Sequence, residues 1–206
     1  MTASTTSPLQ NVSRETFSPL TDYVALLLKW NRAINLIGPA TESQVWSRHI
    51  DDSSQIVELI PSGAASLVDL GSGAGLPGMV IALARPDLKV TLVEQDQRKA
   101  AFLKEAKRLL GLSNVTVEAM DLAKLTRRYD VVTARALAPL AQLLPMAHRL
   151  LQPGGTGIFP KGANYADELA EARRHWRFSQ GLKPSKTNAE SSLITITELN
   201  RIREDD

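Results

Sequence analysis

The feature that most constrains this chain is a cluster of four glycines within eight positions: Gly71, Gly73, Gly75 and Gly78. An apolar run at residues 67–70 precedes it and reads as a short buried strand, because glycine bounds the run at once. Pro77 occupies the first position of a helical run that continues over residues 79–84. Glycine tolerates positive φ angles and lets a ligand approach the backbone where a Cβ would block it. The stretch therefore predicts a strand, a glycine turn and a helix that face a nucleotide-like ligand.

The glycine spacing is compatible with two kinds of ligand. Counted from Gly71 the pattern is GxGxGxxG, and counted from Gly73 it is also the GxGxxG pattern of dinucleotide sites. Asp69 precedes the turn, where a carboxylate repels a pyrophosphate and attracts an ammonium group. Glu94 ends the next expected strand, where an acid can accept both ribose hydroxyls. The two acids favour S-adenosylmethionine, which carries a sulfonium and an ammonium and no phosphate. A turn that only packs helix on strand stays the alternative.

The rest of the chain alternates between strand and helix patterns. Further strands are expected at residues 89–93, 115–117, 129–133, 156–159 and 193–197, and helices at residues 97–110, 137–151 and 165–176. In the helix at 97–110 the residues expected to face inward are Ala100, Ala101, Leu103, Ala106, Leu109 and Leu110. The alternation is typical of an α/β protein with a doubly wound, mostly parallel sheet. The last strand follows an irregular stretch, which favours a closing antiparallel hairpin.

The N-terminal part is helical instead. Residues 1–17 are rich in Ser, Thr, Pro and Asn without an apolar period, so we expect a flexible leader. One helix is expected from Pro19 to Gly38, and two shorter helical pieces begin near Thr41 and Ile56. No polar linker separates them from the first strand. We therefore expect a leader at 1–17, an N-terminal helical cap at 18–62 and the main domain at 63–206.

Composition excludes several classes of protein. The chain of 206 residues has no cysteine, which rules out disulfides, thiolate metal sites and a cysteine nucleophile, and we expect no metal. No run is long enough to span a membrane, and the first 18 residues lack the charged and apolar regions of a signal peptide. We therefore expect a cytoplasmic protein with no membrane partner. The net charge of +2 permits an anionic partner without requiring one.

Charged residues follow five of the expected strands: Asp69, Glu94, Asp121, Arg135 and Lys161. Ligands of doubly wound sheets bind at this end of the strands. Asp121, or the backbone beside it, can receive the adenine amino group, and Arg135 and Lys161 bring positive charge to the side of the methyl acceptor. Each of the five can also be an ordinary polar residue in a solvated loop. Their coincidence favours a site.

Several separate motifs, in order along the chain, resemble one family: Lys29-Trp30-Asn31 with Asn35-Leu36, Arg48-His49-Ile50 with Asp52-Ser53, Asp69-Leu70-Gly71-Ser72-Gly73 continuing through Gly75-Leu76-Pro77-Gly78, then Ala134-Arg135-Ala136 and Lys161-Gly162. The chain resembles the bacterial small-subunit ribosomal RNA methyltransferase G family, also called the glucose-inhibited division protein B family, from about Leu20 to its C-terminus. The resemblance implies a Rossmann-like methyltransferase fold, with a seven-stranded sheet, that uses S-adenosylmethionine.

The resemblance also implies a reaction and a set of contacts. The reaction is methylation of the N7 atom of one guanine in a decoding-region loop of 16S rRNA, within the 30S subunit or an assembly intermediate, by a monomer. Carried over by position, the cofactor contacts are Gly71, Leu76, Leu122, Ala123 and Arg135. The family often has a glutamate where Ala123 aligns, so a contact there would involve only the backbone. The expected cofactor set also includes Asp69, Gly73, Gly75, Glu94 and Asp121.

The residues expected to contact RNA are Lys29, Asn31, Asn35, Arg48, His49 and Lys161. If the cap folds over the pocket, the first five can line its rim. Without the family resemblance, a buried tryptophan beside two solvated polar groups is the preferred explanation of Lys29-Trp30-Asn31. His49, flanked by Arg48 and Asp52, is more plausible as a structural or RNA-contacting residue than as a base.

Guanine N7 has a free lone pair, so methylation there requires no general base, and catalysis can rest on positioning and on the electrostatic effect of Arg135. Three other functions stay open from the sequence alone: a dinucleotide-dependent oxidoreductase, a small-molecule methyltransferase, and a non-catalytic ribosome-associated protein that kept the fold. Binding of the cofactor and the identity of the methyl acceptor distinguish them.

Overall fold

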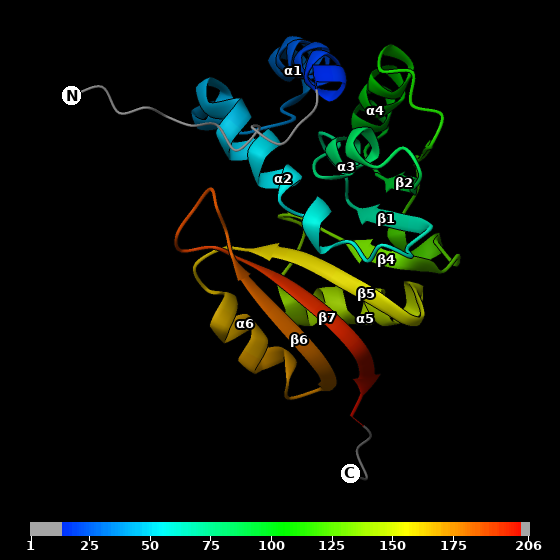
Figure 1. Cartoon of the computed structure of the whole chain (residues 1–206), viewed down its shortest axis with the longest axis vertical. Coiled ribbons are helices and arrows are strands. Elements are labelled where there is room, and N and C mark those ends of the chain that lie inside the picture. The colour runs from blue at the N-terminus through cyan, green and yellow to red at the C-terminus, as the bar shows by residue number, and fades with distance from the viewer. Residues whose placement is uncertain (1–13, 203–206) are drawn as a thin grey trace, which may run out of the picture.

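The computed structural model describes residues 14–202 of the chain (Figure 1). Its first helix, α1 (Arg14–Ile34), begins inside the segment expected to be a leader, and Pro19 lies within the helix. The prediction of a leader reaching residue 17 is therefore wrong at residues 14–17. These residues show no apolar period, so the sequence pattern did not indicate a helix there. The remainder of that expected leader lies outside the described residues.

One sheet runs through the described part of the chain, with the strand order β3-β2-β1-β4-β5-β7-β6 (Figure 1). The strands are β1 (Ser66–Leu70), β2 (Lys89–Val93), β3 (Val115–Glu118), β4 (Tyr129–Thr133), β5 (Leu151–Lys161), β6 (Trp176–Pro184) and β7 (Ser192–Arg201). All neighbours pair in parallel except β7, which is antiparallel to both β5 and β6. The prediction of a mostly parallel sheet with a closing hairpin is confirmed.

The register brings three strand ends to one level. Leu70 of β1 lies opposite Val93 of β2, and Asp69 of β1 lies opposite Thr133 of β4. The loops that follow these strands therefore leave the sheet side by side, at the position where the strand order reverses. Ligands of doubly wound sheets bind in the crevice at this position.

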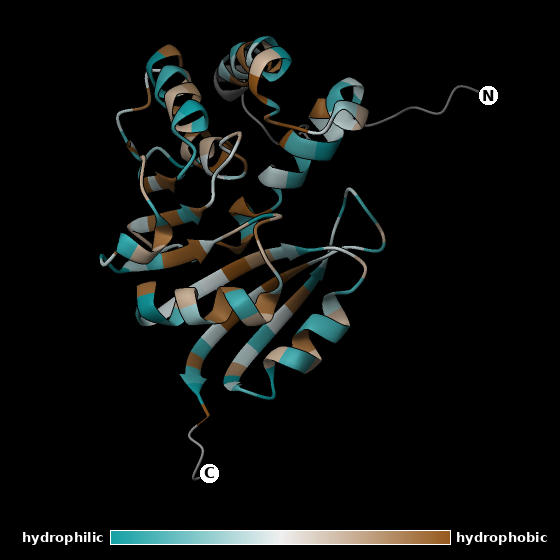
Figure 2. Cartoon of the chain, turned by 180° about the vertical axis from the view of Figure 1, so that it is seen from behind, coloured by the Kyte–Doolittle hydropathy of each residue, from teal (hydrophilic) through white to brown (hydrophobic). Residues whose placement is uncertain are grey.

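Helices cover both faces of the sheet (Figure 1). On one face lie α1, α3 (Gly78–Ala84) and α4 (Gln97–Leu109), and on the other lie α5 (Leu140–Leu150) and α6 (Tyr165–Ala172). Each face has its own apolar core, and Figure 2 shows apolar residues along the strands and on the sides of the helices that face them. No helix in residues 14–202 is long and apolar enough to cross a membrane.

The segment between α1 and β1 is a series of short helical turns: η2 (Pro39–Gln44), the π-helix η3 (Trp46–Asp51), α2 (Asp52–Ser54) and η4 (Val57–Leu59). Ile50 and Ile56 of this segment are buried in the same core as α3 and α4. Side chains of the π-helix are therefore held at a fixed position beside the sheet. Short π-helical segments occur frequently at functional sites.

Several element predictions need correction. The strand β6 was missed, and Trp176 begins it instead of ending a helix. Only Trp176 and Phe178 are buried in this edge strand, so it lacks the apolar run that marks a central strand. The helix expected at 137–151 spans Leu140–Leu150, which leaves residues 137–139 in a loop, and the strand expected at 156–159 already begins at Leu151. In α4, Phe102 is buried whereas Ala101 and Leu109 are exposed, because the apolar face is rotated relative to the one expected.

Candidate functional site

Two adjoining cavities lie along the carboxyl ends of the parallel strands. The larger has a volume of about 640 Å³ and lies over the glycine turn. The smaller, of about 410 Å³, lies beside it over the ends of β4 and β5. Both are lined by Asp52, Arg135, Ala136 and Leu137. These four residues therefore form the boundary at which molecules bound in the two cavities would meet.

The glycine turn forms the floor of the larger cavity. Gly71, Gly73 and Leu76 all line it, as expected. Gly71 and Gly73 have φ angles of +64° and +55°, which side chains rarely permit. A Cβ at Gly73 would find no atom closer than 3.8 Å, so this position opens into the cavity. A ligand can therefore approach the backbone of Gly73 closely.

Glu94 forms the wall beside the turn. Its Oε2 accepts a hydrogen bond from the backbone N–H of Gly73 at 2.9 Å, and its Oε1 accepts one from the backbone N–H of Asp96 at 2.8 Å. Both bonds fix the carboxylate while each oxygen keeps a further lone pair. The buried side chain lines the cavity. It fits the role expected for it, as acceptor of two vicinal hydroxyls.

The end of the cavity away from Arg135 is formed after β3. Asp121 and Leu122 line it. Asp121 accepts a hydrogen bond from the N–H of Ala123 at 2.8 Å and so caps the short helix η5 (Leu122–Lys124). Ala123 itself is not part of the lining, and its amide is already bonded. The expected backbone contact of Ala123 with the cofactor is therefore not supported by this geometry.

Two expected cofactor residues, Asp69 and Gly75, are not part of the cavity lining. Asp69 is 1% exposed, and its Oδ2 accepts a hydrogen bond from the N–H of Gly78 at 3.1 Å. Burial raises the pKa of Asp69 to about 7. A Cβ at Gly75 would approach Met79 Cγ to 2.7 Å, so glycine is needed there for packing. The expectation that Asp69 faces an ammonium group is wrong, because its side chain points to the start of α3.

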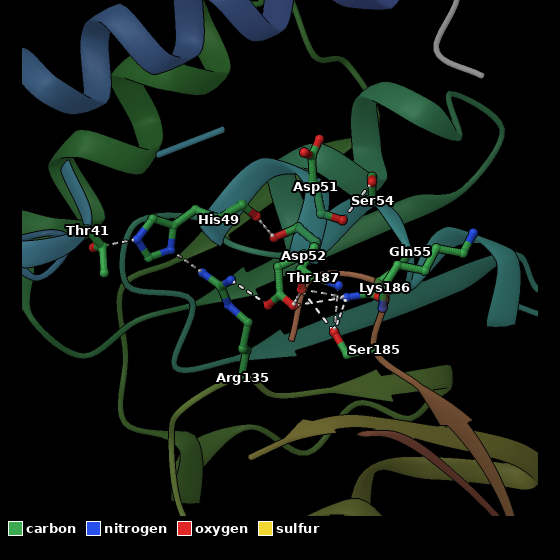
Figure 3. Close-up of polar contacts among 11 residues, drawn as sticks. Thr41, His49, Asp51, Asp52, Ser54, Gln55, Arg135, Ser185, Lys186 and Thr187 are labelled. Carbon is green, nitrogen blue, oxygen red and sulfur yellow. Dashed lines mark hydrogen bonds and ion pairs between the residues drawn. The ribbon is translucent and has the colours of Figure 1, made fainter. Parts of the chain in front are cut away.

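Arg135 is held from one side by His49 (Figure 3). An Nη2–H of Arg135 donates to His49 Nδ1 at 3.2 Å, and His49 Nε2 lies 2.8 Å from Thr41 Oγ1. Thr41 Oγ1 donates to the carbonyl of Gly38 at 2.8 Å, so it accepts from the histidine. These bonds place the imidazole proton on Nε2 and leave Nδ1 as an acceptor. Burial, with the Arg135 charge adding to it, lowers the pKa of His49 to about 4.

Asp52 holds Arg135 from the other side (Figure 3). Its Oδ2 forms an ion pair with Arg135 Nη1 at 3.1 Å. Its Oδ1 accepts a hydrogen bond from Thr187 Oγ1 at 2.7 Å and another from Gln55 Nε2 at 2.9 Å. Sequence reasoning assigned no role to Asp52, Gln55 or Thr187. Their shared site could not be found from spacing, because Thr187 lies 135 residues beyond Asp52.

Lys161 lines the smaller cavity, but its charge is offset. Its ammonium forms an ion pair with Glu168 at 2.8 Å and donates to the carbonyl of Ala138 at 2.6 Å. Hydroxyl groups of Ser185, Ser191 and Ser192 belong to the same lining. The smaller cavity is therefore a polar pocket in which the charges of Lys161 and Arg135 are balanced by Glu168 and Asp52.

The expected RNA-contacting residues separate into two groups. Arg48 and His49 line the larger cavity. Asn31, in contrast, is buried, and its Oδ1 accepts hydrogen bonds from the N–H groups of Leu36 at 2.6 Å and Ile37 at 2.8 Å. The expectation that Asn31 lies at the rim of the pocket is therefore wrong, because its side chain binds backbone N–H groups just after the C-terminus of α1. Lys29 and Asn35 are exposed but line neither cavity.

The sequence matches the family model described as rRNA small subunit methyltransferase G over residues 17–202. It is similar to the "Ribosomal RNA small subunit methyltransferase G" of Methylorubrum extorquens, with 46% identity over 93% of both chains. It is also similar to the protein of that name from Cereibacter sphaeroides, with 47% identity over 93% of this chain and 94% of that one.

Solved structures show the same fold at low sequence identity. An O-methyltransferase from Bacillus cereus in complex with SAH has a TM-score of 0.62 and 12% identity, and the match covers 92% of this chain and 95% of that one. The glycopeptide N-methyltransferase MtfA, complexed with S-adenosyl-L-methionine, has a TM-score of 0.60 and 11% identity over 72% of this chain and 93% of its own. The expectation of a Rossmann-like methyltransferase fold is confirmed.

Proposed function

Because the chain belongs to the rRNA small subunit methyltransferase G family, we propose that it methylates the N7 atom of a guanine in the decoding-region loop of 16S rRNA. The observation that carries the proposal is the pair of adjoining cavities, one built on the glycine turn and one polar and charge-balanced, that meet at Arg135. The dinucleotide reading of the glycine pattern is set aside, since the family match explains the same residues together with the motifs outside the turn.

The larger cavity holds S-adenosylmethionine in this proposal. Glu94 accepts the ribose hydroxyls, the backbone of Gly71 and Gly73 allows close approach, and Asp121 and Leu122 lie where the adenine would be received. When bound, S-adenosylmethionine supplies a methyl group on a sulfonium, and the methyl–sulfur bond breaks with its electron pair left on sulfur as the methyl–N7 bond forms.

The smaller cavity receives the target guanine. Enzymes that modify a base take it out of the stack and into a pocket that reads its edges by hydrogen bonding. The serines of its lining and the half-buried Lys161–Glu168 pair provide donors and acceptors for such an edge. The N-terminal helical cap at 18–62 supplies Asp52 to the boundary and His49 to the larger cavity, and the methyltransferase domain at 63–206 supplies Arg135.

The boundary residues are suited to a reaction that needs no base. Guanine N7 carries a lone pair and no proton, so no proton leaves when the methyl–N7 bond forms, and His49 Nδ1 is not required to accept one. The ring gains positive charge, which an isolated guanidinium would oppose. Asp52, 3.1 Å from Arg135, offsets that charge. The pair therefore offers directed N–H donors for positioning with little net charge.

The setting of the reaction also belongs to the proposal. The substrate is 16S rRNA within the 30S subunit or an assembly intermediate, and the enzyme acts as a monomer in the cytoplasm, without a membrane partner. One chain supplies the lining of both cavities and every contact of Arg135 described above, which is compatible with a monomer.

The test is methyl transfer from labelled S-adenosylmethionine to 30S subunits and to naked 16S rRNA, both from a strain lacking the gene. We expect label on the RNA, a large loss of transfer for Arg135→Ala, and near-normal transfer for the control Arg174→Ala, an exposed arginine remote from both cavities. Cofactor binding without label on RNA would favour a small-molecule or protein acceptor, and absence of cofactor binding would contradict a methyltransferase altogether.

A further inference from the structure

The loop between β6 and β7 lies at the carboxyl end of β5 and contacts the N-terminal segment that holds Arg135 (Figure 3). The N–H of Lys186 donates to Gln55 Oε1 at 2.9 Å, and Thr187 Oγ1 donates to Asp52 Oδ1 at 2.7 Å. Asp52 in turn pairs with Arg135 through its other oxygen. The hydroxyl of Thr187 is therefore linked to Arg135 through the carboxylate of Asp52, by a hydrogen bond on one side and an ion pair on the other.

We propose that Thr187 is a positioning residue for Arg135, acting through the carboxylate of Asp52. The inference rests on the proposed function, in which Arg135 lies between methyl donor and guanine. Thr187 lines neither cavity, and the shortest side-chain contact that it makes is the hydrogen bond to Asp52.

The contacts of Asp52 explain why one hydroxyl matters. The torsion about the terminal bond of a carboxylate is broad, so its plane can turn away from a partner unless both oxygens are held. Oδ2 faces Arg135, and Oδ1 is held by Thr187 and Gln55, whose amide also lies within 3.4 Å of Thr187 Oγ1 and 3.1 Å of Ser185 Oγ. The threonine hydroxyl is thus bonded to the carboxylate and adjacent to the amide that supports it. Its loss removes the shortest contact on Oδ1.

The loop itself has other attachments, so loss of the hydroxyl should leave it in place. Lys183 and Lys186 both form ion pairs with Glu58, the second at 2.8 Å. Hydrogen bonds from the two lysines lower the pKa of Glu58 to about 2. The bond from the Lys186 amide to Gln55 also does not involve the Thr187 side chain. A threonine variant therefore tests the hydroxyl and not the presence of the loop.

The experiment compares Thr187→Val, which keeps the shape without the hydroxyl, with Thr187→Ser, which keeps the hydroxyl. The control is Thr116→Val, at an exposed threonine on β3. The measurements are the single-turnover rate of methyl transfer to 30S subunits at saturating S-adenosylmethionine and the Kd of that cofactor. We expect the valine variant to react about tenfold to a hundredfold more slowly, as small misplacements of reacting groups do, with a Kd within about twofold of the wild type.

Rescue of the rate by serine supports the proposal. A wild-type rate in the valine variant overturns it, and so does a slow rate that serine fails to restore or that comes with weakened cofactor binding. If Thr187→Val does not fold, Thr187→Ala removes the same hydroxyl and is judged by the same outcomes. Failure of the wild-type enzyme to methylate RNA would instead refute the proposed function, so the two failures are distinguishable.

Discussion

His49 shows how a histidine beside a reaction site can be excluded as a base by its contacts. Its Nδ1 already accepts a hydrogen bond from Arg135, and its Nε2 donates to Thr41. Protonation of Nδ1 would break the first bond and place two positive charges together. Burial and the Arg135 charge lower the pKa of His49 to about 4 for the same reasons. The imidazole is therefore a fixed neutral acceptor at physiological pH.

This role predicts the pH dependence of the reaction. Since His49 is neutral above its lowered pKa, we expect the single-turnover rate to be flat between about pH 5.5 and pH 8. His49→Gln, whose amide oxygen can accept the same N–H from Arg135, should keep a flat profile. A wild-type rate that falls tenfold per pH unit below about pH 6.5 would show that a histidine base takes part.

Asp69 gives a second prediction, on stability. Its pKa is raised from 3.8 to about 7 in the folded protein, chiefly by burial. The folded state therefore holds a proton that the unfolded state has released above about pH 4. The stabilisation from that proton is complete below the unfolded pKa and is lost as the pH rises through about 7.

The variant Asp69→Asn cannot titrate there and keeps an acceptor for the N–H of Gly78. In urea unfolding, its stability relative to the wild type should rise from pH 4 to pH 7 and then level off. His49 titrates in both proteins, so its opposite effect cancels in the difference. The exposed Asp167→Asn serves as control. A difference in stability between Asp69→Asn and the wild type that stays constant with pH would contradict the raised pKa of Asp69.

The sequence identified most strand-end residues correctly but not the direction of each side chain. Glu94, Asp121 and Arg135 line the cavities because the register brings their strand ends together. Asp69 is at an equivalent position in the sequence yet points to the start of α3, because the N–H there attracts it. Strand-end position follows from the apolar pattern, whereas side-chain direction depends on neighbours that only the folded chain provides.

At the scale of elements, the glycine turn combines two separate requirements. Gly73 keeps open space over the larger cavity, whereas Gly75 keeps space within the core against α3 and α4. Both glycines have positive φ, at +55° and +82°. The pattern of alternating glycines looks uniform in the sequence but serves binding at one position and packing at the next.

Alanine substitutions should separate these requirements. Gly75→Ala places a Cβ 2.7 Å from Met79 Cγ and 2.9 Å from Leu103 Cδ2, so we expect a loss of about 2–4 kcal/mol in the free energy of unfolding. Gly73→Ala introduces only backbone strain, so we expect a loss of about 1–2 kcal/mol in the free energy of unfolding. It should, however, weaken the binding of S-adenosylmethionine more than about tenfold. Urea unfolding and calorimetry measure the two effects. A larger loss of stability in Gly73→Ala, together with weaker cofactor binding in Gly75→Ala, would contradict the geometry.

Element prediction succeeded for β2 and β4 and failed for β6, at one edge of the sheet. The ranges expected for β2 and β4 match the structure because both are buried apolar runs. The strand β6 alternates two buried aromatic residues with exposed polar ones, so its sequence does not separate it from the end of a helix. The loop before α5 was also missed. It carries Ala136 with a positive φ of 53°, which no residue preference indicated.

At the scale of the whole molecule, the contacts that hold Arg135 at the boundary of the two cavities come from three distant parts of the chain. The N-terminal segment supplies His49 and Asp52, the loop after β4 supplies Arg135, and the C-terminal hairpin supplies Thr187. The sequence indicated the first two as separate motifs, because their residues resemble those of one family. It could not show that they converge, since contacts over such separations depend on the topology of the sheet.

The charge distribution predicts how RNA binding responds to salt. Residues 121–206 contain 13 basic and 10 acidic residues, and no long basic tract occurs. Few phosphates are therefore neutralised, and we expect the affinity for 16S rRNA to fall about tenfold between 50 mM and 200 mM salt. Filter binding over this range measures the slope. A fall of about a thousandfold would require many phosphate contacts and would contradict recognition concentrated at the pocket.

The most direct test of the account is the position of the methyl group on the RNA base. After transfer to 30S subunits or rRNA lacking the modification, borohydride reduction and aniline treatment cleave RNA only where guanine carries a methyl on N7. We predict cleavage at a single guanine of the decoding-region loop, with all transferred label in N7-methylguanine. Label on an exocyclic amine or on N1 of a base would require removal of a proton, and it would contradict a site in which His49 and Arg135 provide no base.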